Sequence, residues 1–179
     1  MSTLSRTAAM AALSLTLSAC SPTFNWRELR PAGTPLLALM PCKPESASRS
    51  VPLAGAPVAL HMHSCEAGGL RFAVAWADVG DASQVAPAMD AWRRAGLQSI
   101  RVPAAGDAAT DTAWPVQVPG AVAVVGVQAN GTDPQGQPVQ TRAAYFTRGT
   151  QVYQAAVYGT RLPGEALDAF FAGLQLPSP

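Results

Sequence analysis

The clearest pattern in the chain is a pair of neighbouring segments with alternating side chains. Residues 58–65 place apolar side chains on one face of an extended strand, and two histidines with a cysteine on the other. Residues 70–77 place four large apolar side chains on one face, and Arg71 with three alanines on the other. Gly68 and Gly69 separate the segments, so the pattern predicts an antiparallel hairpin. The row of alanines indicates that a helix packs closely on that face.

Helical spacing begins directly after this hairpin. Asp81 predicts a helix N-cap, and apolar residues at helical spacing continue to Leu97, with Gly96 as the expected stop. We expect residues 45–50 to form a loop, and residues 103–120 to form a long loop held to the domain by Trp114. The other apolar segments predict six strands, at 36–40, 51–53, 99–102, 122–128, 139–147 and 151–158, and a closing helix at 163–174.

The first 20 residues follow a different pattern. Arg6 precedes a short apolar run over residues 7–17, as in a secretory signal, and that run is shorter than the roughly 20 apolar residues of a membrane span. The segment Leu-Ser-Ala-Cys that ends at Cys20 resembles the lipobox of bacterial lipoproteins, in which the leader is cut before a cysteine that carries diacylglycerol. The resemblance implies a signal peptide at 1–19, a lipidated tether at 20–25 and one domain at 26–179.

Lipidation of Cys20 would place the protein on the periplasmic face of the cell envelope. Two or more acyl chains give stable membrane anchoring. Position 21 is Ser rather than Asp, which by the same resemblance favours the outer membrane over the inner membrane. The alternative is an ordinary signal peptide that has a cysteine near its cleavage site.

Composition restricts the remaining chain further. Without residues 1–19 it has 160 residues, enough for one domain with a sizeable core. Arg6 is one of the 12 basic residues, so 11 basic and 11 acidic residues remain, with no basic stripe for nucleic acid. Cys42 and Cys65 form an even pair in an exported chain, which predicts a disulfide. Closing that loop would stabilise the fold by about 3 kcal/mol.

The order of elements and several short motifs resemble a known group of proteins. The motifs are Met-Pro-Cys-Lys-Pro at 40–44, Gly-Gln-Pro-Val at 136–139, Tyr-Gln at 153–154 and Phe-Phe-Ala-Gly-Leu at 170–174. They are similar to those of small Gram-negative envelope proteins with a PsbP-like α/β/α sandwich, many of them lipoproteins of unknown activity. The resemblance implies an α+β fold with helices on both faces of an antiparallel sheet, and it transfers no catalytic residues.

The sharpest candidate chemistry lies at His61, His63 and Cys65. Successive members would lie about 6.5–7 Å apart on one strand face, and imidazole and thiolate are good ligands for copper or zinc. Such a site needs Cys65 reduced, or another ligand from elsewhere, whereas the predicted disulfide consumes Cys65. Two histidines on a strand face are also compatible with a plain surface role.

Motifs of common enzyme classes are not found in the sequence. There is no Gly-x-Ser-x-Gly elbow, no His-Glu-x-x-His and no phosphate-cradling glycine loop. We therefore expect a non-catalytic binding or assembly module without a cofactor. It would hold the membrane through the lipid on Cys20 and contact an envelope protein partner. The alternative from a different class is a periplasmic metal-binding protein that uses His61 and His63.

Overall fold

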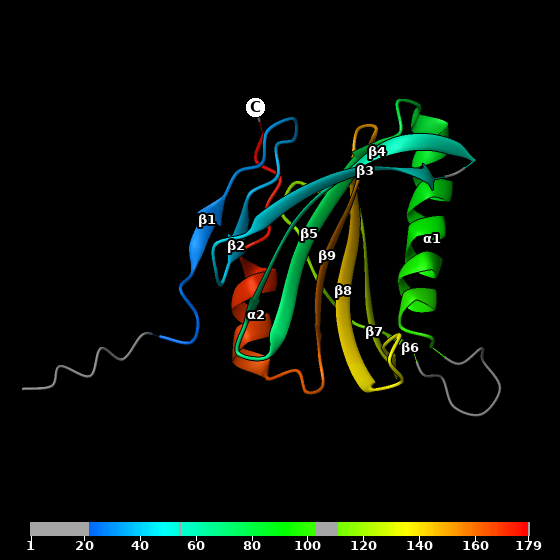
Figure 1. The fold of residues 1–179 in the computed structure, drawn as a ribbon. Helices are drawn as coiled ribbons and strands as arrows, with labels where there is room; N and C mark the ends of the chain where they lie inside the picture. The colour runs from blue at the N-terminus through cyan, green and yellow to red at the C-terminus, as the bar shows by residue number, and fades with distance from the viewer. Residues whose placement is uncertain (1–21, 54, 103–110, 179) are drawn as a thin grey trace, which may run out of the picture.

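The computed structural model describes residues 22–53, 55–102 and 111–178. Within these ranges the chain is α+β, with a seven-stranded antiparallel sheet in the order β3-β4-β5-β9-β8-β7-β6, a small two-stranded sheet and two helices (Figure 1). The strands are β1 (Arg27–Leu29), β2 (Ala38–Met40), β3 (Glu45–Leu53), β4 (Ala56–Ala67), β5 (Leu70–Asp78), β6 (Asp111–Ala113), β7 (Ala123–Thr132), β8 (Pro138–Arg148) and β9 (Gln151–Gly159). The helices are α1 (Ala82–Ser99) and α2 (Gly164–Ala172). Neither of these two helices is long and apolar enough to cross a membrane.

The two helices lie on opposite sides of the large sheet, as Figure 1 shows. The cause is visible in β5, whose side chains alternate between the faces. Phe72, Val74 and Trp76 belong to the buried cluster that includes α2. Ala75 and Ala77 belong to the cluster that includes α1. The predicted hairpin of residues 58–65 and 70–77 is confirmed as β4 and β5, and the prediction that a helix packs on the alanine face is confirmed as well.

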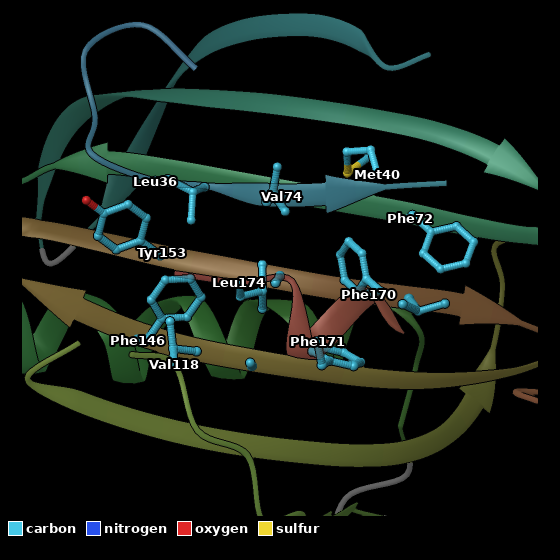
Figure 2. Close-up of a cluster of buried hydrophobic side chains, with 14 of the residues drawn as sticks. Leu36, Met40, Phe72, Val74, Val118, Phe146, Tyr153, Phe170, Phe171 and Leu174 are labelled. Atoms are coloured by element: carbon cyan, nitrogen blue, oxygen red, sulfur yellow. The ribbon is translucent and has the colours of Figure 1, made fainter. Parts of the chain in front are cut away.

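The face covered by α2 holds the larger side chains. Figure 2 shows Phe72 and Phe170 directed toward each other, and their ring centroids lie 5.3 Å apart in an edge-to-face arrangement. Phe146 and Tyr153 stack in parallel at 5.0 Å. All four side chains are almost completely buried. Aromatic side chains bury large areas, so this side carries most of the hydrophobic stabilisation.

The face covered by α1 is built from smaller side chains. Asp81 caps α1 by accepting a hydrogen bond from the Ser83 N–H at 2.8 Å, as predicted. The expected stop at Gly96 is wrong, because α1 continues to Ser99. Gly96 lies where a Cβ atom would collide with the Tyr145 hydroxyl. The glycine therefore permits close approach of the helix to the sheet.

Two further sequence expectations are wrong. Residues 45–50 form most of β3, an edge strand paired with β4 from Glu45↔Ser64 to Leu53↔Ala56. These six residues are all exposed, so the strand lacks the buried face that produces an apolar alternation. Residues 99–102 form the end of α1 and a turn, not a strand. Ile100 is buried there, and its carbonyl accepts a hydrogen bond from the Thr132 N–H.

The segment before β1 docks on the core. The rings of Phe24 and Trp26 both meet Phe72 edge-to-face, at 6.2 and 6.3 Å. The Asn25 N–H donates to the Pro41 carbonyl at 2.7 Å. The disulfide between Cys42 and Cys65 is present, and it joins the segment after β2 to β4.

Part of the long loop predicted at 103–120 lies within the described residues. Residues 111–113 form the short strand β6, which the sequence did not indicate, and residues 103–110 lie outside the described ranges. Trp114 holds this segment to the domain, since its ring meets Phe171 edge-to-face at 4.5 Å and carries the Arg142 guanidinium above it at 5.0 Å.

Candidate functional site

A cleft of about 960 Å³ opens on the face of the sheet that α1 only partly covers. Its floor is formed by β5 and β9, with Ala73, Ala75, Gln154 and Tyr158. One wall is the second half of α1, and the other is the β3–β4 hairpin. The wall residues that shape its interior are Val51, Leu53, Leu60, Met62, Trp92 and Gly96. A concave, mainly apolar site of about 300–1,000 Å³ is typical of small-molecule binding.

The register of the hairpin explains why the cleft exists. β4 pairs with β5 only from His61↔Trp76 onward, whereas β3 pairs with β4 over its whole length. Residues 56–60 therefore diverge from β5, which itself continues along β9 to Asp78, and they reach toward α1 (Figure 1). Leu60 of this segment and Leu53 of β3 share a buried cluster with Trp92 of α1. The hairpin thus closes the cleft at one end without filling it.

Small side chains leave the space open. Ala73 and Ala75 stand on the floor where β5 carries large residues on its other face. Met62 opposite them is 37% exposed, although it is an apolar residue in the middle of a strand. An apolar side chain in this position is available for contact with an apolar ligand.

Charged side chains gather at the end of the cleft beside the β4–β5 turn. Arg71 donates to a carboxylate oxygen of Glu66 from Nε at 2.9 Å and from Nη2 at 2.6 Å. Both side chains are about two-thirds exposed, at 64% and 66%, so water weakens this ion pair. Lys43 and Glu45 line the same region, and Arg49 lies farther along β3. Among the described residues, Arg49 forms no ion pair.

The phenol groups near the floor are held in their neutral form. Burial raises the pKa of Tyr158, and burial also raises the pKa of Tyr145. Gln154 donates a hydrogen bond from Nε2 to the Tyr145 hydroxyl at 2.9 Å. At neutral pH the floor therefore offers uncharged hydrogen-bonding groups, and no phenolate is available there as a base.

The two histidines of the chain lie on the opposite face of β4 from the cleft. Both imidazole rings stack on Trp76, His61 at 5.1 Å and His63 at 5.6 Å. Burial, followed by the charge of His61, lowers the pKa of His63. Neither ring lines the cleft, so the cleft contains no imidazole that could act as a general base.

The geometry around these histidines does not complete a metal site. Cys65 is bonded to Cys42 and has no free thiolate. Within the described ranges, no group of three or more His, Cys, Asp or Glu residues could hold a metal ion. In the structure, His61 and His63 stack on the Trp76 indole and cover it. Copper or zinc binding by His61 and His63 stays a prediction, and the described residues supply no third ligand for it.

The structure does not describe the predicted lipidation site, and the sequence did not predict the cleft. Cys20 lies outside the described residues. The cleft itself was not predicted from the sequence. In the sequence, the features that relate to the cleft are the alanines at 73 and 75 and the alternate residues of β3. Of these β3 residues, Glu45, Arg49 and Val51 line the cleft.

Comparisons with known proteins add no assignment. No model of a known protein family matches the sequence, and no curated protein shows significant similarity to it. The function therefore has to be inferred from the chain itself.

Proposed function

We propose that this protein is a lipid-anchored periplasmic module that binds a ligand in its cleft without catalysing a reaction. The observation that carries the proposal is the cleft itself, which is open, largely apolar and about 960 Å³ in volume. It lacks an imidazole, and the thiols of Cys42 and Cys65 are consumed by their disulfide. Binding by apolar contact, with charged groups at one end, is the chemistry that these side chains support.

The location proposed for the protein rests on the leader. The lipobox-like segment ending at Cys20 supports a lipid anchor, and Ser21 favours the outer membrane. The disulfide is in keeping with this location, because disulfides persist in the oxidising periplasm. Helices on both faces of an antiparallel sheet also agree with the PsbP-like resemblance, which we retain as part of the proposal.

The anchor is tested by the variant Cys20→Ser. We expect the wild-type protein to sediment with membranes and to need detergent for release. We expect the variant to lose this association. Equal membrane association of the two proteins after a high-salt wash would refute the lipid anchor on Cys20.

Binding in the cleft is tested by a photoreactive amino acid placed at Met62 in living cells. Met62 faces the cleft, whereas Ser48 is exposed on the opposite face of the same hairpin and provides the matched control. After irradiation, the purified protein is analysed by mass spectrometry. We expect a defined adduct at position 62 that is absent at position 48. A folded protein without any adduct at position 62 would refute cleft binding.

A further inference from the structure

We infer that the ligand of the cleft is a single-chain amphiphile with an anionic headgroup, taken up from the bilayer to which the protein is tethered. This inference rests on the proposed function, both for the lipid anchor and for the cleft as the binding site. It adds the class of the ligand and the direction from which it enters.

The chain leaves the domain at the same end as the charged part of the cleft. Gly68 in the β4–β5 turn lies so close to Thr23 and Phe24 that a Cβ atom on it would crowd the phenyl ring. Glu66 and Arg71, which flank this turn, line the cleft. Both features therefore lie at one end of the sheet.

Other elements of the cleft reach the same end of the sheet. Arg71 pairs with Tyr158 at the end of β9. The β7–β8 turn contributes Asp133 and Pro134 to the cleft lining. The Ile100 carbonyl accepts the Thr132 N–H, which brings the end of α1 to this turn.

The tether is too short to place this end far from a membrane. Thr23 follows Cys20 by three positions. An extended chain covers at most about 3.6 Å per residue, or about 11 Å over these three steps. Docking of Phe24 and Trp26 on Phe72 fixes the start of the domain. A lipid on Cys20 therefore holds the charged end of the cleft next to the headgroup layer.

The lining suits a single chain with a charged head. Leu60, Met62 and Trp92 offer apolar contact in the interior. Lys43 and Arg71 lie at the end nearest the tether, next to Glu45 and Glu66. An acyl chain that leaves a bilayer for an apolar cleft gains little hydrophobic free energy, because both surroundings are apolar. Selectivity must then come from the headgroup. A carboxylate or phosphate would replace the Glu66 carboxylate on Arg71, whose exposed ion pair is weak, and would accept the hydrogen bonds that Arg71 now gives to Glu66.

Photolabelling of the complete lipidated protein tests this inference. The protein is reconstituted in vesicles of phosphatidylethanolamine and phosphatidylglycerol that contain a probe with a diazirine near the end of its chain. One arm uses a fatty acid and a second uses lysophosphatidylglycerol, which distinguishes a carboxylate from a phosphate. A third arm uses an uncharged monoacylglycerol. We expect at least one anionic probe to label the cleft segment of β4, at Leu60 or Met62.

Three variants make the result specific. Met62→Glu places a charge in the interior and should reduce labelling of the cleft by at least about fivefold, since an unpaired carboxylate opposes an apolar chain. Ser48→Glu adds the same charge on the opposite face and should leave labelling unchanged. Arg71→Ala should reduce labelling by the anionic probes and not by the monoacylglycerol. All three positions are exposed, and circular dichroism checks that each variant is folded.

The outcomes separate this inference from the proposed function. Labelling confined to Phe24 and Trp26, or equal labelling of wild type and Met62→Glu, would overturn the inference. So would labelling by the monoacylglycerol equal to that by both anionic probes. If the photoreactive group at position 62 captures a peptide in cells, the cleft is a binding site and only the amphiphile is wrong. If neither experiment finds a ligand in the cleft, both proposals fail.

Discussion

Removal of the disulfide provides a quantitative test of how the cleft end of the domain is held. Cys42 and Cys65 are separated by 23 positions, and their Cα atoms lie 5.9 Å apart. Closing a loop of this length restricts the unfolded chain and stabilises the fold by about 3 kcal/mol. For a domain of this size, 1 kcal/mol corresponds to roughly 2–4 °C, so Cys42→Ala/Cys65→Ala should lower the melting temperature by about 6–12 °C.

Thermal unfolding followed by circular dichroism measures this effect. The wild type is compared with and without a reductant, which removes the cross-link but keeps both sulfur atoms. The double variant should melt close to the reduced wild type and should not respond to the reductant. If reduced and oxidised wild type melt within about 2 °C of each other, the loop-closure reasoning is refuted. A mass of the unreduced chain two hydrogens above that of the bonded form would refute the disulfide itself.

Three further predictions concern the fold. Asp81→Ala should lower the melting temperature at neutral pH, because it removes a carboxylate whose pKa the Ser83 N–H holds below its ordinary value. The difference in melting temperature between wild type and variant should be largest at neutral pH and should disappear as pH falls through that lowered pKa. Gly131→Ala should destabilise the domain by about 1–3 kcal/mol in denaturant titrations, since its Cβ would collide with the Ile100 carbonyl, whereas Gly164→Ala, with open space around it, should not. Burial raises the pKa of all three tyrosines of the chain, Tyr145, Tyr153 and Tyr158. Absorbance at 295 nm should therefore show no phenol ionising near pH 10 in the folded protein. The stability of the fold should decrease as pH rises above 10.

Each result has a clear opposite. A wild-type and Asp81→Ala difference that persists unchanged at pH 2 would contradict the carboxylate cap. Equal stability of the two glycine variants would contradict the close approach at Gly131. A tyrosine that titrates normally in the folded state would contradict its burial.

The elements that could be predicted from the sequence are those with a buried face. β4, β5 and β7 to β9 carry local alternation, and α1 and α2 carry helical spacing with a cap or a helix-opening proline. Residues 51–53 of β3 were predicted as a strand, but residues 45–50 were not, because this part of the edge strand is fully exposed and has no need of apolar residues. Gly96 was misread as a stop because its role depends on Tyr145, which follows about 50 positions later in the chain.

The cleft depends on tertiary arrangement even more strongly. Ala73 and Ala75 look alike in the sequence, and both suggest a covering helix. In the structure Ala75 joins the cluster packed with α1, while both alanines also form the floor of the cleft. Which part of an alanine row is covered depends on where α1 ends and how far the hairpin overhangs β5. The local sequence pattern determines neither the end of α1 nor the position of the hairpin relative to β5. The histidines show the reverse case, because an apparent ligand pair rests on Trp76.

The two-sided character of β5 has a consequence for how this protein can change over time. Phe72 and Val74 are sealed into the aromatic core, whereas Ala73 between them borders the cleft. Substitutions at alternate positions of a single strand therefore act on separate properties. Under the proposed function, ligand preference can drift through one set of residues while folding is maintained by the other, so that related chains would retain this scaffold and differ in the ligand that they bind.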